Sequence, residues 1–277
     1  MNLLRISYIF LLSVFLISCC LEAYEIVSEN NTTKHLGYGD WYINTDGELH
    51  LMQQLLRPQD TVFDVGANVG EWSLYALGVE KSILLYSFEP LPVIFSDLKN
   101  KLSNYSNANA FNLALSDQIG KSNFCYYDET YDFSGLSGFY VREVLKADHQ
   151  PPQMIEVAQD TLLHFCLEHS IDKIDFLKID AEGAEWIILK GASALIENNK
   201  IRAIQFEYGG CYVDAKTKLK DVFYLLSNND YLIFRIMPHG LIRIAEWNSS
   251  LENFELSNYL AIKKEDVLDR LGMSFNP

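Results

Sequence analysis

The stretch Asp60–Gly78, DTVFDVGANVGEWSLYALG, decides the fold. Its apolar start predicts a buried strand that ends near Asp64, and EWSLYALG predicts a helix. The turn between them carries Gly66 and Gly70, and glycine lets a backbone approach a ligand because no Cβ stands in the way. The start of the helix adds free N–H groups and a positive dipole end. The stretch therefore predicts a ligand-binding turn between a strand and a helix.

A second predicted strand, SILLYSFEP, carries Glu89 at its end, nineteen residues after Gly70. A carboxylate at such a place accepts hydrogen bonds from the two hydroxyls of a ribose. Asp64 can accept from an ammonium group, directly or through water, or can simply cap the turn. Ser116 or Asp117, after a third apolar run, can reach an adenine amino group, although Ser-Asp is also ordinary turn chemistry. Together these residues predict a cofactor that contains a nucleoside.

Two classes of cofactor compete for this turn. Dinucleotide sites require G-x-G-x-x-G, whose middle glycine admits a pyrophosphate. Here Asn68 stands in place of that glycine, and Gly70 follows two positions later. A pyrophosphate fits less well, which disfavours an NAD-dependent oxidoreductase. S-adenosylmethionine has no phosphate but carries an amino-acid end and a sulfonium, and it is the cofactor we expect.

From Asp60 onward, short apolar strands alternate with amphipathic helices. This alternation predicts an α/β fold with a mainly parallel central sheet and helices on both faces. The last strands, YLIFRI, LIRIAEW and NYLAIKK, have no helix between them, so we expect an antiparallel C-terminal section. AFNLALSD is expected to be one strand and AEWIILKGASALIENN one helix. Residues 133–152, rich in Gly, Ser and Pro, are expected to form a long functional loop.

A second group of polar residues follows the strand DFLKI. Asp180 and Glu182 come directly after it, and Glu207 lies at the end of the next strand, IQFEYGG. Ligands of open α/β sheets bind at the carboxyl ends of strands, and gathered carboxylates either raise a pKa or bind a metal. A divalent metal held by Asp180, Glu182 and Glu207 is a secondary hypothesis. Glu185 is expected only to favour the start of the next helix.

These blocks, in this order, resemble the FkbM-type family of S-adenosylmethionine-dependent methyltransferases. The resemblance rests on FDVGANVGEWSL, SFEPLP, NLALSDQIGKSNF, DFLKIDAEGAEWIILKGA and IQFEYGG. It implies a Rossmann-like class I methyltransferase fold and O-methylation of a sugar, a glycan or another small hydroxylated acceptor. By resemblance, the cofactor motif comprises Asp64, Gly66, Asn68, Gly70 and Glu89. Asp180 and Glu182 fall on the acidic motif, where either carboxylate can take or orient the hydroxyl proton.

The N-terminus has the form of a secretory leader. MNLLRISYIFLLSVFLISCC has one early arginine and then an uncharged apolar run, followed by acidic residues. We therefore expect a signal peptide, lipoprotein leader or membrane anchor in residues 1–23, a helical cap in 24–59 and the FkbM-like domain in 60–277. The expected location is the secretory pathway or a membrane, or the cytoplasm if the true start codon is later.

This leader conflicts with a cofactor that is made and kept in the cytosol. The alternative to an enzyme is therefore an exported, catalytically inactive binding module on the same fold. The charge of the chain limits the classes of binding partner. Its 37 acidic and 22 basic residues give a formal net charge of -15. Such a chain repels phosphate backbones, which excludes nucleic acid as a favoured partner.

Overall fold

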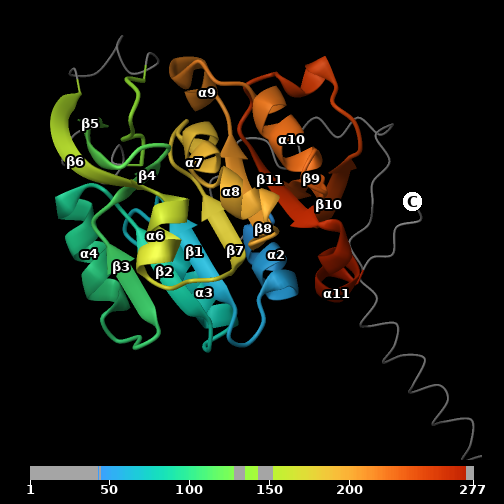
Figure 1. The fold of residues 1–277 in the computed structure, drawn as a ribbon, viewed down its shortest axis with the longest axis horizontal. Coiled ribbons are helices and arrows are strands. Elements are labelled where there is room, and N and C mark those ends of the chain that lie inside the picture. The colour runs from blue at the N-terminus through green and yellow to red at the C-terminus, as the bar shows by residue number, and fades with distance from the viewer. Residues whose placement is uncertain (1–42, 44, 128–134, 143–151, 273–277) are drawn as a thin grey trace, which may run out of the picture.

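The computed structural model describes residues 43, 45–127, 135–142 and 152–272 (Figure 1). The expected leader, residues 1–23, and most of the predicted cap lie outside the described residues. In the part of the chain that is described, no helix has the length and apolar character needed to cross a membrane. This finding corrects the predicted secretory or membrane-associated location. Within the described part of the cap, residues Glu48–Leu55 form the helix α2.

An eight-stranded sheet forms the centre of the molecule, in the order β10-β9-β11-β8-β7-β1-β2-β3. Its parallel strands are β1 (Thr61–Val65), β2 (Leu84–Phe88), β3 (Ala108–Phe111), β7 (Ile174–Ile179) and β8 (Ile201–Tyr208). Its antiparallel strands are β9 (Tyr231–Met237), β10 (Gly240–Ile244) and β11 (Ser257–Lys263). The parallel centre and the antiparallel C-terminal section are confirmed.

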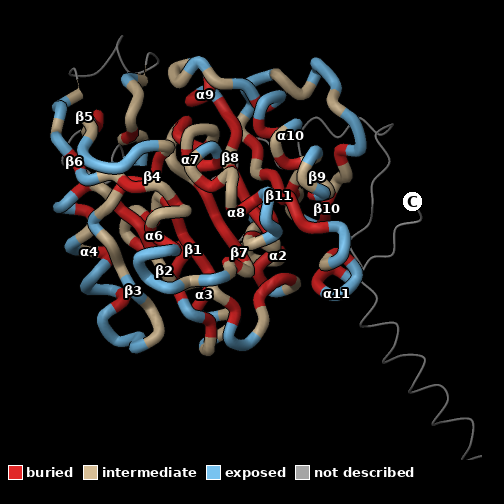
Figure 2. Tube along the Cα trace, viewed as in Figure 1, coloured by how far each residue is buried: buried red, intermediate tan, exposed pale blue. Residues whose placement is uncertain are grey.

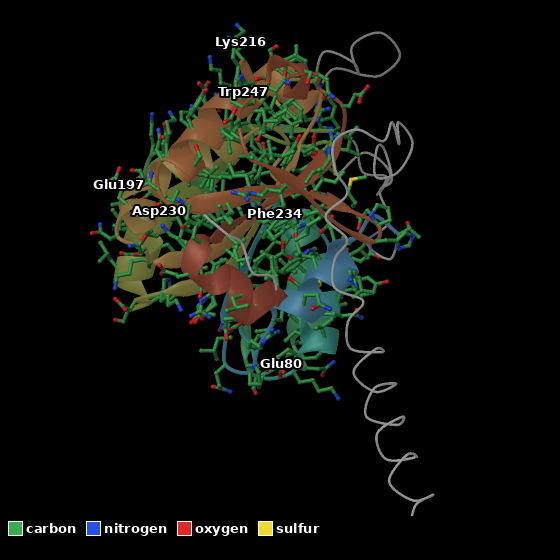
Figure 3. The ribbon with its side chains drawn as sticks, turned by 90° about the vertical axis from the view of Figure 1, so that its right-hand side faces the viewer. Glu80, Glu197, Lys216, Asp230, Phe234 and Trp247 are labelled. Atoms are coloured by element: carbon green, nitrogen blue, oxygen red, sulfur yellow. The ribbon has the colours of Figure 1, made fainter. Side chains whose placement is uncertain are left out.

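Helices cover both faces of this sheet, as the alternation of elements predicts. One apolar cluster joins residues of the strands to those of α2, α3 (Glu71–Val79), α4 (Pro92–Leu102) and α11 (Val267–Leu271). The other cluster involves α6 (Leu162–Glu168), α7 (Glu185–Gly191), α8 (Ser193–Glu197), α9 (Cys211–Ala215) and α10 (Leu219–Ser227). Figure 2 shows the strands between these layers as mostly buried. In Figure 3, Phe234 lies inside the molecule, whereas Glu197, Lys216 and Asp230 lie at its edge.

The predicted third strand, AFNLALSD, is wrong as a single element. Its first half is β3 in the large sheet, and its second half is β4 (Ala114–Ser116) in a separate sheet of order β4-β6-β5. Between them, Asn112 Nδ2 donates to the carbonyls of Glu89 and Pro90, at 3.0 and 2.8 Å. These bonds hold the chain where it leaves the large sheet. The small sheet is completed by β5 (Gly120–Tyr126) and β6 (Gln153–Thr161). The strand β6 was not predicted from the sequence.

The predicted helix AEWIILKGASALIENN is likewise two helices, α7 and α8. The break follows Gly191, where a Cβ atom would lie 2.1 Å from the carbonyl oxygen of Ser116. Only glycine allows α7 to pack this closely against β4. Of the predicted long loop, residues 135–142 and 152 are described, and Cys125 and Gly138 pair across an isolated β-bridge.

Candidate active site

A cavity of about 290 Å³ lies at the carboxyl ends of β1, β2 and β7. One wall is apolar, and a second carries polar groups of the two predicted constellations. The apolar wall includes Leu91, Leu113, Leu115, Phe124 and Phe139. The polar wall includes Gly66, Asn68, Glu89, Asp180, Glu182 and Glu207. The fold therefore brings six of the predicted residues to one space, which we call the first cavity.

The glycine turn fits tightly between two strands. Gly66 has φ 77°, and a Cβ atom there would lie 1.8 Å from the carbonyl oxygen of Asp180. Its N–H and that of Ala67 both donate to the carbonyl of Phe88, at 3.1 and 2.9 Å. Glycine is required here for the close approach as well as for the backbone conformation. Gly70, by contrast, does not line the first cavity: it precedes α3 with φ 84° and packs against Leu98.

Glu89 is buried at the rim of the turn. Its Oε2 accepts from the N–H of Asn68 at 3.1 Å, and its Oε1 accepts from the N–H of Leu91 at 2.8 Å. Burial raises the pKa of Glu89 to about 7, against the lowering effect of these two hydrogen bonds. The Oδ1 of Asn68 is buried without a hydrogen-bond partner. A carboxylate fixed by backbone donors beside an unsatisfied oxygen suits a ligand rich in hydroxyl and amino groups.

Asp64 does not line the first cavity. It has no exposed surface, its Oδ2 accepts from Ser73 Oγ at 2.7 Å, and its Oδ1 lies 3.2 Å from Lys178 Nζ. Lys178 was not predicted as a site residue, and it also lies 3.4 Å from Asp180 Oδ2. Burial disfavours its ammonium form, but the surrounding carboxylates, Asp64 first, outweigh burial and raise the pKa of Lys178. A lysine inside the apolar strand DFLKI, two residues before Asp180 and thus on the same face, was the available signal.

Ser116 and Asp117 are not brought to the first cavity. Ser116 is buried in the small sheet, where its hydroxyl contacts the carbonyl of Gln118 and Gln159 Oε1, both at 3.0 Å. Asp117 pairs with Lys190 Nζ at 2.5 Å. Both residues lie away from the first cavity because the predicted third strand divides into β3 and β4, and β4 belongs to the small sheet. The cavity wall nearest to them is formed by Leu113, Ala114 and Leu115 instead.

The second predicted group, the carboxylates that follow β7 and end β8, also lines the first cavity. Oxygens of Asp180, Glu182 and Glu207 lie within 4.8 Å of one another. Burial raises the pKa of Glu182 to about 8, and burial with the neighbouring carboxylates raises that of Glu207 well above its ordinary value. Glu185 instead accepts a hydrogen bond from the N–H of Ala181 at 2.8 Å, at the start of α7.

Arg142, another residue that the sequence did not reveal, reaches this group from the long loop. Its guanidinium pairs with Glu182 and with Asp214, the latter at 3.1 Å. The three carboxylates offer the oxygen ligands of a divalent cation, but Arg142 already compensates one of them. The divalent metal stays a prediction.

A second cavity, of about 370 Å³, lies on the α2 side of the glycine turn. It shares Gly66, Asn68 and Asp180 with the first cavity. Glu48 and Lys178 are among its other lining residues. Asp180 therefore faces both spaces, and its side chain is 41% exposed, against 14% for Glu182.

Comparisons with known proteins agree with this geometry. The methyltransferase FkbM domain matches residues 64–233, which is more than half of the chain. The chain belongs to the FkbM methyltransferase domain family. Its fold is the Rossmann-like class I methyltransferase fold, with the cavities at the carboxyl ends of the parallel strands.

Several relatives share this part of the chain. The 31-O-demethyl-FK506 methyltransferase FkbM of Streptomyces tacrolimicus is 31% identical over 157 residues, 49% of this chain and 60% of that protein. The 2-O-methyltransferase NoeI of Sinorhizobium fredii is 24% identical over 57% of this chain and 67% of its own length. Among solved structures, Aeropyrum pernix fibrillarin in complex with S-adenosyl-L-methionine has 11% identity and a TM-score of 0.41, covering 78% of this chain and 73% of that one.

Proposed function

We propose that this FkbM-domain chain is an S-adenosylmethionine-dependent methyltransferase that acts on a hydroxyl of a sugar, a glycan or another small hydroxylated acceptor. The observation that carries the proposal is the first cavity, which joins the Gly66 turn and Glu89 to Asp180 and Glu182. The names of two relatives, a 31-O-demethyl-FK506 methyltransferase and a 2-O-methyltransferase, support transfer to oxygen.

The residues of the first cavity fit the nucleoside of this cofactor. Glu89 offers its carboxylate to the ribose hydroxyls, Gly66 admits close approach to the backbone, and the apolar wall receives the base. When bound, S-adenosylmethionine supplies a methyl group on a positively charged sulfur. A cation placed near the carboxyl groups of the first cavity stabilises their ionised forms.

Asp180 is the residue best placed to act on the acceptor. It lines both cavities and is less covered than Glu182, so it can take or orient a hydroxyl proton. Glu182, held by Arg142, forms the wall beside it. Much of the rate enhancement then comes from holding the hydroxyl and the cofactor close and aligned. The net charge of -15 supports a neutral acceptor over nucleic acid.

Isothermal titration of S-adenosylmethionine into the full chain tests the proposal. Glu89→Gln removes the carboxylate beside Gly66 and is expected to weaken binding roughly tenfold or more. Glu197→Gln, the same change on the exposed surface, is expected to leave binding unchanged. Absence of binding by the folded wild-type chain would contradict the proposal and favour a binding module without catalysis. Binding would justify a search for methyl transfer to sugars and small hydroxylated acceptors.

A further inference from the structure

The second cavity raises the question of where the amino-acid end of the cofactor lies. S-adenosylmethionine is elongated, with a nucleoside at one end and an α-amino acid at the other. Because the two cavities meet at Gly66, Asn68 and Asp180, a molecule whose nucleoside lies in the first cavity can extend into the second. This reasoning rests on the function proposed above.

The acidic residue of the glycine motif is already occupied. Asp64 has no exposed surface and lines neither cavity. One of its oxygens accepts from Ser73, and the other faces the ammonium of Lys178. An ammonium group of a ligand therefore needs a different carboxylate.

Glu48 of α2 supplies such a carboxylate in the second cavity. Its Oε2 accepts from Gln205 Nε2 at 2.6 Å, and its Oε1 accepts from Asn258 Nδ2 at 2.9 Å. These donors come from β8 and β11, so three separate elements fix the orientation of one side chain. Both donors are neutral amides, which position the carboxylate without cancelling its charge, and each oxygen retains capacity for a further hydrogen bond.

The charges around Glu48 favour a cationic ligand group. Asp46 and Asp180 also line the second cavity, together with one cation, Lys178, which is shared with the buried Asp64. Burial, followed by repulsion from Asp46, raises the pKa of Glu48 to about 8. An ammonium group placed against the carboxylate relieves both effects, because it stabilises the ionised form.

We propose that the second cavity holds the amino-acid end of S-adenosylmethionine, with the Glu48 carboxylate accepting hydrogen bonds from the ammonium group. Helix α2, which belongs to the described part of the predicted cap, then contributes a residue to the cofactor site. Glu48 takes the place that the glycine motif alone would assign to Asp64.

Two nucleosides distinguish this contact from a general effect on the fold. S-adenosylhomocysteine carries the same amino-acid end, whereas 5′-methylthioadenosine lacks it. In isothermal titrations of the full chain, Glu48→Gln is expected to weaken S-adenosylhomocysteine roughly tenfold or more and to leave 5′-methylthioadenosine nearly unchanged. The matched control is Glu197→Gln, an exposed carboxylate that lines neither cavity, which is expected to change neither affinity appreciably.

A ligand-side measurement needs no variant. The deamino analogue of S-adenosylhomocysteine is expected to bind the wild-type chain as weakly as S-adenosylhomocysteine binds Glu48→Gln. Equal losses for both nucleosides in Glu48→Gln, or no loss of S-adenosylhomocysteine, would overturn the role of Glu48 while leaving the methyltransferase proposal intact. Failure of the folded wild-type chain to bind any of these nucleosides would overturn both.

Discussion

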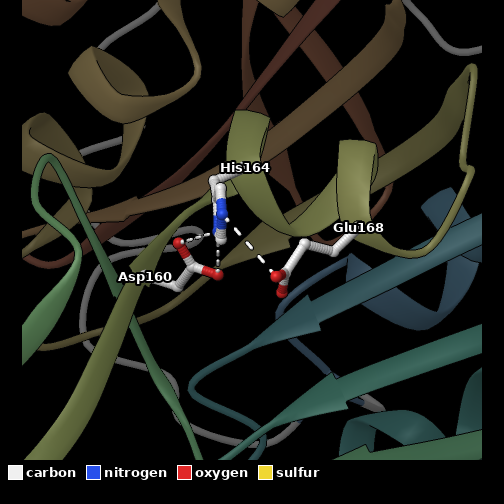
Figure 4. A group of neighbouring side chains, drawn as sticks. All are labelled: Asp160, His164 and Glu168. Atoms are coloured by element: carbon white, nitrogen blue, oxygen red, sulfur yellow. Dashed lines mark hydrogen bonds and ion pairs between the residues drawn. The ribbon is translucent and has the colours of Figure 1, made fainter.

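Two groups of side chains in the described part of the chain have the spacing of metal ligands, and they differ in every other respect. Asp160 lies at the end of β6, and His164 and Glu168 lie in α6, which follows it directly. Both ring nitrogens of His164 face a carboxylate, at 2.9 and 3.7 Å (Figure 4). The second group, Asp180, Glu182 and Glu207, comes from two strand ends and lines the first cavity.

The difference lies in how charge is compensated. In the helical group, one histidine lies between two carboxylates of the segment 160–168, with Asp160 buried, His164 half-buried and Glu168 exposed. In the cavity group, carboxylates gather from distant segments, and their compensation comes from Arg142 on a loop and Lys178 inside the sheet. Charge pairing between residues four apart is common along a helix. A buried group of like charges, by contrast, destabilises the fold and is a feature typical of functional sites.

Lys178→Met removes the buried cation that pairs with Asp64 and Asp180. It is expected to cost about 3–5 kcal/mol of unfolding free energy, because it leaves Asp64 buried and uncompensated. Urea unfolding measures the loss. The control is Lys200→Met, which removes an exposed ion pair with Asp172 and is expected to cost less than about 1 kcal/mol. Adding Asp64→Asn to Lys178→Met is expected to restore part of the stability. Equal effects of the two lysine variants would show that burial does not distinguish the two kinds of pair.

Gly66→Ala tests whether the cavity group depends on close backbone packing. The new Cβ would lie 1.8 Å from the carbonyl oxygen of Asp180, in a conformation with φ 77°. Strain and overpacking together are expected to cost roughly 2–4 kcal/mol and to weaken S-adenosylmethionine binding. Gly78→Ala is the control, because nothing lies within 4 Å of its Cβ position in α3, and it is expected to stabilise by about 0.5–1 kcal/mol. Urea unfolding of both variants decides, and similar free energies would refute the packing argument.

Glu207→Gln is expected to stabilise the chain at alkaline pH, because it removes a carboxyl group whose ionisation is opposed by burial and by the neighbouring carboxylates. The folded-state pKa of Glu207 is raised, so its proton favours the folded state and stability falls as pH rises from the unfolded pKa through the folded one. The gain from Gln is therefore expected to be about 0.5–2 kcal/mol near pH 8.5 and close to zero near pH 5.

Urea unfolding at the two pH values measures this gain, with Glu197→Gln as the exposed control. The control is expected to stay within about 0.5 kcal/mol of the wild type at both pH values. A loss of stability in Glu207→Gln near pH 8.5 would show that this carboxylate is compensated in the fold.

Part of this site follows from sequence by one rule. Glycines and carboxylates that directly follow parallel strands meet at one edge of the sheet, and this rule brings Gly66, Glu89 and Asp180 together. The rule failed for Ser116. It applies only to strands of one sheet, and β4, which ends at Ser116, belongs to the small sheet. Asn112 and its bonds to the β2–α4 connection decide otherwise, and a tertiary contact of this kind leaves no periodic signal in the sequence.

Other parts of the site depend on contacts between distant segments. Arg142 precedes Glu182 by forty residues and lies in a stretch with mixed signals. Glu48 acquires its orientation only when α2 packs against Gln205 and Asn258. In each case a polar side chain on one element is positioned by donors or acceptors from others, so spacing within a motif cannot reveal it.

His164→Gln probes the helical group and has the smallest expected effect. Hydrogen bonding to Asp160, against partial desolvation, raises the pKa of His164, and Glu168 adds to the increase. A raised histidine pKa stabilises the folded state below the unfolded pKa, about 6.5, and this contribution disappears as pH rises through the folded pKa. Thermal unfolding is therefore expected to show a lower melting temperature for His164→Gln near pH 5.5 and little difference near pH 9. Asp160→Asn is expected to remove that pH dependence.

Because the group is expected to act through charge pairing, zinc ions should leave the melting temperature of the wild type unchanged. A rise with zinc that His164→Gln abolishes would make this group a metal site, and the contrast between the two groups would then rest on the cavity alone.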